Sequence, residues 1–344
     1  MGTNEEMRKI QFTGKSSYIV SLPKQWIMDM GLKQGDQVAV VRQGVSNLQI
    51  VPLKHHNKPV GTEEATIEIK PEDEDSTIVR KLISLYLLGF TIINVKSKVG
   101  RLKPSQRNSI KDAVKSILMG TEITADSVEG ITIQVLINLF ELSVDGALKR
   151  MLIIAKSMQN DALLAQEEAN FELAKEVINS DDEVDRFNLY VVRQLKMAIQ
   201  NPRIIKEIGL KNARDCLGYR LVTKSVERTA YHAASIAKNV LLLKEPINEE
   251  ILGNLEEMSR LAISMFETAI ESLFRLDFNL AETVIQKTKD VNFTMKEALL
   301  SSKRIGIEEI ANVRLVIESL RRTAEYASDI AEIVLNLTVE SIIG

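Results

Sequence analysis

The sequence has a single cysteine, one tryptophan and few aromatic residues, which make up 5% of its 344 residues. With only Cys216, the chain can form no intrachain disulfide and no cysteine cluster for zinc or an iron–sulfur centre. Cys216 lies in a strongly helical stretch, where we expect a buried, inert thiol. No apolar run reaches the roughly 18 residues that span a bilayer, and the first residues lack the basic and then apolar order of a signal peptide. We therefore expect a cytoplasmic protein without membrane insertion.

The chain also lacks the local signatures of common enzymes. It has three histidines, no Ser-His-Asp or Cys-His set with a plausible local pattern, and no phosphate-binding P-loop. We expect no enzyme, although dispersed carboxylates acting together are recognised only by their geometry. The length allows about two or three domains, and the composition, with 45% hydrophobic and 26% charged residues, is ordinary for a soluble globular protein.

The first fifty residues predict a small unit built mostly of β-strands. Between Gly14 and Lys24, the apolar residues Tyr18, Val20 and Leu22 alternate with neighbours of mixed polarity, which is the period of a half-buried strand. A unit of this size has little core of its own, so we expect it to need a partner. The predicted strands are Lys9–Phe12, Tyr18–Leu22, Val38–Val41 and Leu48–Leu53, with a short helix at Lys24–Met30 after the second strand.

Three motifs in this unit fall together: Gly14-Lys15, Leu22-Pro23-Lys24 and Gly31-Leu32-Lys33-Gln34-Gly35-Asp36. With them, residues 7–53 resemble the AbrB/MazE/SpoVT family of DNA-binding domains. The resemblance implies a swapped-hairpin β-barrel in which two chains interleave, and hence a homodimer that presents basic loops to DNA. The residues at the family's basic DNA-facing positions are Arg8, Lys9, Lys15 and Lys24.

The charge of this segment agrees with a DNA-binding surface. Residues 1–60 hold eight lysines and arginines against four acids, a net charge of +4, in a chain whose total is −3. A local positive field is what phosphate neutralisation requires, and it makes binding strongly salt-dependent. The alternative is a solvated basic edge on a unit that only dimerises.

A second pattern follows a polar connector at residues 54–61. Apolar residues that alternate with polar ones predict strands, and apolar residues spaced three or four positions apart predict helices. Gly89 marks the end of one helix, and Pro104 marks the start of the next. The order strand, helix, strand, helix, strand, strand predicts a small α/β domain. This domain either holds a ligand or serves as a spacer and dimerisation unit, and we favour the second. The predicted elements are 66–69, 77–88, 91–95, a helix from 104, 121–125 and 131–136.

From about Asn138 the chain becomes helical to its end. Apolar residues at three- and four-residue steps, with breaks near 167–168, 201–202, 244–246, 277–278 and 302–306, predict six helices. These helices form two repeats of three: Ala174–Ile178 corresponds to Ala281–Ile285, and Val226–Ala230 corresponds to Leu320–Ala324. Two tandem three-helix bundles follow from this repeat.

The repeated segments, over residues 139–337, are similar to PhoU, the phosphate-uptake regulator family built from two three-helix bundles. The fold class is therefore multidomain: an AbrB-like swapped-hairpin β-barrel, a small α/β middle domain and C-terminal all-α tandem bundles. The expected domains are 1–54, 62–137, 138–245 and 246–344. AbrB-like and PhoU-like parts occur together in archaeal phosphate regulators.

The PhoU resemblance also implies metal ions, bound by a Glu-Arg-Ile-Gly-Asp motif in each bundle whose two acids lie four residues apart on one helix face. This sequence departs from the motif, because Tyr231 stands at the first aspartate position and Arg321 replaces the second glutamate. A divalent or ferric ion would use the acids that remain. The alternative is that these acids are solvated helix-face residues. The candidates are Glu227, Asp181, Asp185, Glu325 and Asp329.

Together, these resemblances imply a DNA-binding transcriptional regulator of phosphate uptake and phosphate homeostasis, acting at promoters of phosphate-uptake genes. The bundles would be its signal-receiving or partner-docking module, with a phosphate transporter ATPase or a signalling protein as partner. The alternative is an adaptor that does not bind DNA and negatively regulates a transporter or sensor kinase by protein contact. A toxin-neutralising role is less favoured, because antitoxins of this kind are short chains with disordered tails.

Overall fold

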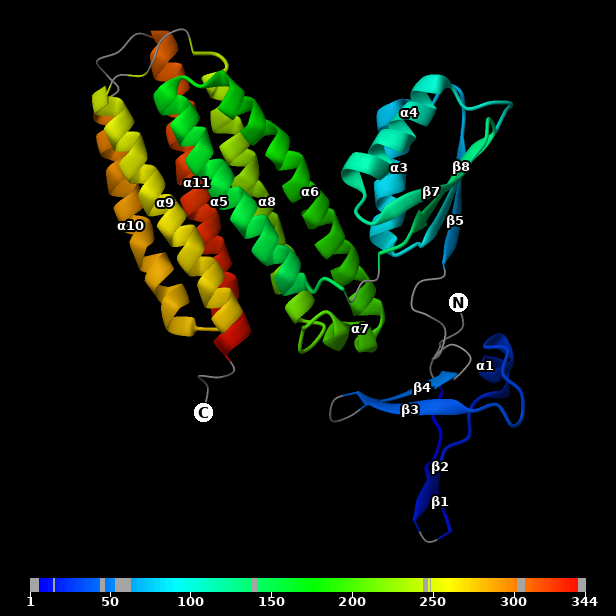
Figure 1. The fold of residues 1–344 in the computed structure, drawn as a ribbon. Coiled ribbons are helices and arrows are strands. Elements are labelled where there is room, and N and C mark those ends of the chain that lie inside the picture. The colour runs from blue at the N-terminus through cyan, green and yellow to red at the C-terminus, as the bar shows by residue number, and fades with distance from the viewer. Residues whose placement is uncertain are drawn as a thin grey trace. The chain divides into compact units, whose positions relative to one another are not determined.

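The computed structural model describes residues 6–14, 16–43, 47–52, 63–137, 141–243, 247, 249–301 and 307–339. The chain divides into two compact units, Met1–Thr62 and Glu63–Gly344, and Figure 1 shows the elements of each. Among the described helices, none combines the length and the apolar character that a membrane crossing requires.

The first unit consists of two separate hairpins and a short helix. The first two strands pair antiparallel with Phe12 opposite Tyr18, and the last two pair antiparallel with Val40 opposite Ile50. The order predicted from the sequence, strand, strand, helix, strand, strand, is confirmed. The elements are β1 (Gln11–Thr13), β2 (Ser17–Ile19), α1 (Lys24–Asp29), β3 (Val38–Gln43) and β4 (Asn47–Pro52).

The described residues of one chain do not close a barrel. Each hairpin is its own two-stranded sheet, and no ladder joins one hairpin to the other. The swapped-hairpin barrel expected from the sequence needs strands from a second chain, so it stays a prediction about the dimer. One chain supplies two open hairpins with free edges, which are templates for pairing with another chain.

The second unit begins with a four-stranded sheet in the order β5-β6-β8-β7. The first pair of strands is parallel and the other two pairs are antiparallel. The predicted α/β order is confirmed, and Gly89 ends α3 with a φ of 101°, a left-handed conformation that glycine adopts without strain. The elements are β5 (Glu64–Ile69), α3 (Asp75–Leu88), β6 (Ile92–Ser97), α4 (Pro104–Asp112), the π-helical segment η1 (Ala113–Ile117), β7 (Thr121–Asp126) and β8 (Gly130–Val135).

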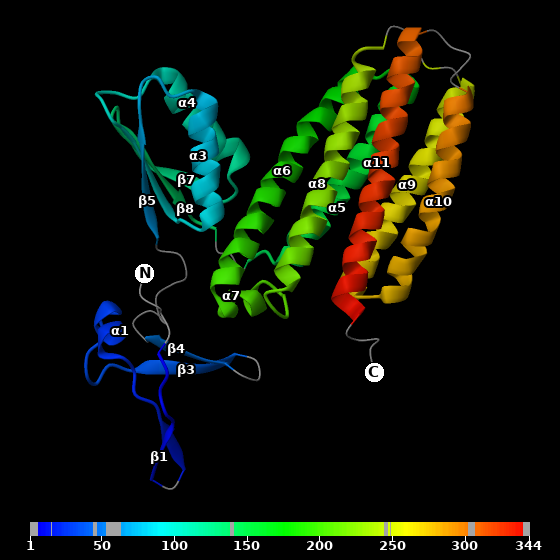
Figure 2. The ribbon, with the colours of Figure 1, turned by 180° about the vertical axis from the view of Figure 1, so that it is seen from behind.

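One face of this sheet is apolar and covered by helices. Alternate strand residues such as Ile93 and Ile133 are fully buried against Leu82 and Tyr86 of α3. Figures 1 and 2 both show α3 and α4 on the side of the sheet that faces α6. The other face is polar: the Asn94 amide donates to Glu64 Oε1 at 2.6 Å. This arrangement follows from the two-residue period of the strands.

Six long helices and one short helix complete the described part of the second unit. In the first bundle α5, α6 and α8 pack together, in the second α9, α10 and α11 do, and α8 packs against α11 between them. The predicted tandem three-helix bundles are confirmed by this packing. The helices are α5 (Val144–Glu168), α6 (Phe171–Gln200), α7 (Pro202–Glu207), α8 (Asp215–Val240), α9 (Glu249–Arg275), α10 (Phe278–Ser301) and α11 (Ile307–Thr338).

Two helix starts differ from the sequence expectation. The helical region was expected from about Asn138, but α5 begins at Val144, where the Ser143 hydroxyl accepts a hydrogen bond from Gly146 N at 3.1 Å and caps the helix. Residues 138–140 lie outside the described residues. The segment after Pro202 forms the separate short helix α7, and α8 starts at Asp215. The Asp215 carboxylate accepts from Lys211 N at 3.0 Å, which fixes the turn before α8.

A buried arginine fastens the α/β domain to the first bundle. Arg193 of α6 is 1% exposed, donates to the carbonyls of Tyr86 and Gly89 at the end of α3, and lies 4.8 Å from the Tyr86 ring centroid. A cation at a helix C-terminus meets the negative end of the helix dipole. Burial lowers the pKa of Arg193. The Arg193 guanidinium therefore caps α3 from the neighbouring domain.

Candidate functional site

The predicted DNA-facing cations lie on the hairpin unit. Lys9 and Lys24 are exposed, and Lys24 opens α1 directly after the buried Pro23. Arg8 forms an ion pair with Glu6, which offsets part of its charge. Lys15 lies outside the described residues. The described cations are thus accessible to solvent, while their use in DNA binding stays a prediction.

The apolar residues beside these cations are exposed. Phe12 and Tyr18 stack edge to face with ring centroids 5.1 Å apart, yet they are 59% and 73% exposed. Val40 and Leu48 on the second hairpin are 62% and 72% exposed. Strand residues that alternate in the sequence therefore form apolar faces that nothing within the described unit covers.

The unit has almost no interior. Of the residues of this unit whose side-chain exposure the structure describes, three are buried: Pro23, Leu32 and Pro52. Burial of apolar side chains is the main favourable contribution to folding, and a domain of about 60 residues is marginal even when its core is complete. The hairpin unit therefore lacks the core that a stable monomer needs.

In the first bundle, three of the predicted metal-binding acids influence one another. Asp181 and Asp185 lie on α6, and Glu227 lies on α8. Burial, then the charges of Glu227 and Asp181, raises the pKa of Asp185 to about 6. Burial also raises the pKa of Asp181, although the Lys238 charge opposes the shift. The packing of α6 on α8 thus brings together acids that the sequence placed on two separate helices.

A lysine of the same chain already neutralises this cluster in part. Lys224 Nζ lies 2.5 Å from Glu227 Oε2, one turn before it on α8. This ion pair places a positive charge of the chain beside the glutamate, at the position where a metal ion would supply one.

In the second bundle, arginines hold the corresponding acid. Glu325 pairs with Arg321 and, at 3.1 Å, with Arg322. Both arginines also contact Glu318, at 2.6 Å and 3.1 Å. Burial, followed by the charges of Glu332 and Glu325, raises the pKa of Asp329. The Arg321 that departs from the family motif therefore supplies an internal cation to Glu325.

The predicted acids do not fit a preassembled metal site. Among the described residues, no group of three or more histidine, cysteine, aspartate or glutamate side chains is placed to hold an ion. Glu227 and Glu325 are each occupied by a cation of the chain. A metal ion at Glu227, Asp181, Asp185, Glu325 or Asp329 stays a prediction.

The described histidine and the cysteine are part of the helix packing. His232 Nδ1 lies 3.3 Å from Ser319 Oγ on α11, and burial lowers the pKa of this histidine. Cys216 is 1% exposed, and burial raises the pKa of its thiol. The sequence expectation of a buried cysteine is confirmed.

The sequence reasoning missed the polar residues buried between helices. Arg193 is one, and Gln159 of α5 is another, whose amide donates to Thr229 O at 3.1 Å and Thr323 Oγ1 at 2.9 Å. Gln159 therefore joins α5 to both α8 and α11. Arg193 and Gln159 each lie at a position of the helix face that is otherwise apolar. A polar residue within such an apolar face is the sequence signal that could have identified them.

The PhoU domain model matches residues 148–240 and 255–334, which together make up half of the chain. The model of the bacterial antitoxin MazE, described as antidote-toxin recognition, matches residues 11–58. No curated protein matches the chain.

Two solved structures are similar to the helical region. PhoU from Pseudomonas aeruginosa superimposes with a TM-score of 0.51 and 22% identity, over 57% of this chain and 96% of that one. The phosphate transport system regulatory protein PhoU from Streptococcus pneumoniae gives a TM-score of 0.48 and 21% identity, over 60% and 99%. The first likeness supports the fold, and the PhoU model covers both bundles. The chain belongs to the PhoU family and carries a MazE-like domain at its N-terminal end.

Proposed function

We propose that this protein regulates phosphate transport as a DNA-binding homodimer. Two copies of the hairpin unit interleave into a barrel that binds promoters of phosphate-uptake genes. The bundles receive the phosphate-status signal, by docking a transporter ATPase or a signalling protein. A partner that prefers the DNA-free or the DNA-bound form would couple the two ends of the chain.

The observation that carries the proposal is the exposed apolar surface of the hairpin unit. Phe12, Tyr18, Val40 and Leu48 are each more than half exposed. A second copy of the same unit offers matching apolar faces and free strand edges, so pairing would bury surfaces that the monomer leaves in water. The MazE-like match over 11–58 supports the same arrangement.

Charge supports DNA as the ligand of this dimer. Lys9 and Lys24 are exposed, and dimerisation doubles the number of such cations on the assembly. Phosphate contacts supply most of the sequence-independent affinity of a protein for DNA and fix its register. The PhoU domain match over both bundles supports a regulatory role for the same chain.

The test is DNA binding by the full chain as a function of salt. Lys15→Glu together with Lys24→Glu is expected to weaken binding to phosphate-uptake promoter fragments at least hundredfold and to flatten the salt dependence. Lys96→Glu with Lys115→Glu is the matched control, because both lysines are exposed residues of the α/β domain and the charge change is the same.

Unchanged affinity in the Lys15 and Lys24 variant would show that the hairpin unit does not hold the DNA. Absence of specific promoter binding by the wild-type chain, with recovery of a transporter ATPase in a pull-down, would favour the adaptor function instead. Footprints on genomic DNA in phosphate-rich and phosphate-poor cells test the sensory part.

A further inference from the structure

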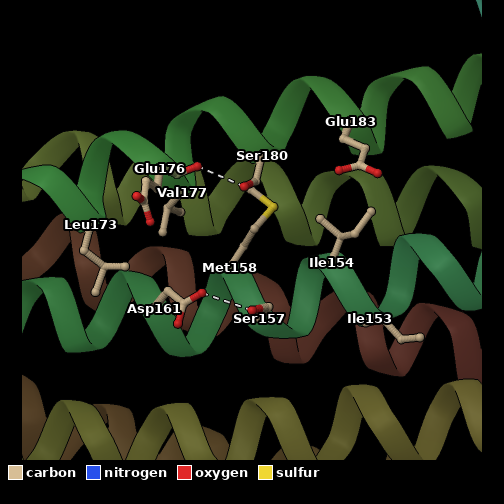
Figure 3. A pocket seen from close by; sticks show the side chains of 10 residues that line it. All are labelled: Ile153, Ile154, Ser157, Met158, Asp161, Leu173, Glu176, Val177, Ser180 and Glu183. Atoms are coloured by element: carbon tan, nitrogen blue, oxygen red, sulfur yellow. Dashed lines mark hydrogen bonds between the residues drawn. The ribbon is translucent and has the colours of Figure 1, made fainter.

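A groove runs between α5 and α6 on the first bundle. It encloses about 330 Å³, and Figure 3 shows the side chains that line it from both helices. The α5–α6 turn near it is tight: Ala169 has a φ of 49°, and the Asn170 side chain accepts from Leu173 N at 3.1 Å. Its lining includes three acids, Asp161, Glu176 and Glu183, and the aliphatic residues Ile153, Ile154 and Leu173.

The groove combines an apolar floor with carboxylates. Met158 and Val177 are buried at its base, whereas Ile153 is 67% exposed. In Figure 3 the carboxylates of Glu176 and Glu183 point from α6 toward α5. Asp161 stands on α5, where its carboxylate accepts a hydrogen bond from Ser157 Oγ at 3.0 Å. The groove therefore offers both apolar contact and negative charge.

Within the part of the chain that the structure describes, no lysine or arginine is paired with these three acids. The lining contains three acids and, within the described part of the chain, neither lysine nor arginine. Asp161, Glu176 and Glu183 form no ion pair with any other described residue. A concentrated charge without a counter-ion favours a ligand of opposite sign.

A second groove on the same unit shows the contrast. It encloses about 430 Å³ between α8 and α11, and its lining holds Lys224 and Arg228 as well as Asp329 and Glu332. Positive and negative side chains both line that groove, so the charge of its carboxylates is offset by cations of the same lining. The α5–α6 groove differs in that its lining carries one sign only.

We propose that the α5–α6 groove docks a basic amphipathic helix of a partner protein. Glu176 and Glu183 stand seven residues apart on α6, roughly 10 Å along the helix axis, which matches cations two turns apart on a facing helix. The apolar side of that helix would lie on Ile153, which is exposed, and on the half-buried Ile154 and Leu173. Amphipathic helices bind to grooves in this way, with apolar anchors at three- and four-residue spacing.

This inference deepens the proposed function, because it places the docking partner of the bundles at one surface and gives its chemistry. The partner segment is recognised by lysines or arginines along one flank and by aliphatic residues beside them. The acids supply orientation and association rate, and the accessible aliphatic side chains of the lining supply burial.

The probe is a synthetic 18-residue helix of leucine, alanine and lysine, with the lysines along one flank, labelled for fluorescence anisotropy against the full chain. Glu176→Lys with Glu183→Lys is expected to weaken its binding at least tenfold at low salt. Glu129→Lys with Glu257→Lys makes the same charge change at exposed positions outside the groove, and is expected to change affinity by less than about twofold.

Two further measurements separate docking from general attraction of charge. Ile153→Ser leaves the charge unchanged and is expected to weaken the probe about threefold to tenfold by removing apolar contact. A photo-crosslinking version of the probe is expected to label residues between 153 and 183. Circular dichroism of every variant should match the wild type, since the substituted side chains are exposed.

Equal weakening in the groove variant and in the control variant would overturn the proposal, and so would labelling elsewhere on the bundles. Crosslinks from residues 6–52 to the groove, formed without the probe, would show that the hairpin unit of the chain is the occupant and would likewise overturn it. Promoter binding by the Glu176 and Glu183 variant is measured in parallel. If this variant still binds promoter DNA but no longer binds the probe, the groove and the DNA-binding surface are separate. The two proposals can then fail independently of each other.

Discussion

The hairpin unit exposes many of its apolar side chains, whereas the second unit buries them in a core. In the hairpin unit, Phe12 and Tyr18 face solvent, whereas in the second unit Leu82, Ile93 and Ile133 are fully buried. In both units, apolar residues recur in the sequence at the spacing expected for the strands and helices that form. The difference shows that hydrophobic periodicity predicts an apolar face on a strand or helix, but does not predict what covers that face. In the second unit, other elements of the same unit cover it. In the hairpin unit, no described element does.

The largest effect is expected from opening the core of the second unit. Leu82→Ala removes a fully buried side chain of α3, and should lower the free energy of unfolding by about 2–5 kcal/mol. Urea titration followed by far-ultraviolet circular dichroism measures this. Leu88→Ala on the same helix is the control, because Leu88 is 48% exposed, and its cost should stay below about 1 kcal/mol. Similar costs at the two positions would contradict the described core.

The next effect concerns the junction held by Arg193. Arg193→Met removes the side-chain donor to the Gly89 carbonyl and one of two donors to the Tyr86 carbonyl, which keeps the Gly89 amide at 3.1 Å. A buried acceptor left without a donor costs roughly 1–3 kcal/mol. Amide exchange should rise first in the last turn of α3. Lys196→Met changes an exposed residue on the same helix and should leave exchange unaltered. Unaltered exchange at α3 in the Arg193 variant would mean that other contacts hold the domains together.

A smaller effect distinguishes the two units directly. Trp26 of α1 is the one tryptophan of the sequence, so its fluorescence reports on the hairpin unit, while circular dichroism reports mainly on the helices. If two copies complete the hairpin unit, a tenfold dilution should lower its stability by about 1.4 kcal/mol. The helical transition should not move. A Trp26 midpoint that is independent of protein concentration would contradict the dimer.

The smallest effect concerns the acid cluster of the first bundle. The pKa of Asp185 is raised from 3.8 to about 6, so the native state binds this proton more tightly than the unfolded state does. The ionised carboxylate therefore costs stability above about pH 6, and that cost disappears as the pH falls toward 4.

Asp185→Asn removes this cost, which is on the order of 1 kcal/mol after allowing for solvent screening of a partly exposed side chain. The variant should be more stable than wild type at pH 7.5 and equal to it near pH 4, as measured by urea titration. Glu176→Gln, at an exposed position of the same helix whose charge does not act on Asp185, is the control and should show little change. If the stability difference between Asp185→Asn and wild type is the same at pH 7.5 and at pH 4, the pKa of Asp185 is not raised by the neighbouring acids.

Much of the fold follows from local sequence signals. Gly89 ends α3 where a left-handed residue is needed, and Pro104 opens α4 where the missing amide hydrogen costs nothing. The tandem bundles follow from the internal repeat. The π-helical turn at Ala113–Ile117 was not predictable, because a single added residue in a helix leaves the apolar pattern almost unchanged. The domain boundaries stay predictions.

The candidate sites were less predictable than the fold. The sequence placed Asp181 and Asp185 on one helix and Glu227 on another, but their influence on one another arises from the packing of α6 against α8. The sequence also marked Arg321 as a departure from the family motif, without showing that it pairs with Glu325. Ion pairs between neighbours on one helix are common, and which pair forms depends on the surrounding helices.

By itself, the sequence determined the order and type of the elements, the repeat of the two bundles and the basic character of the hairpin unit. These depend on residue spacing and composition, which the chain carries locally. Only the tertiary structure decided that Arg193 caps a helix of another domain, that Asp185 lies near Glu227, and that the described lining of the α5–α6 groove carries acids and neither lysine nor arginine. Such features depend on which surfaces meet, because electrostatic energies change with separation and burial rather than with distance along the chain.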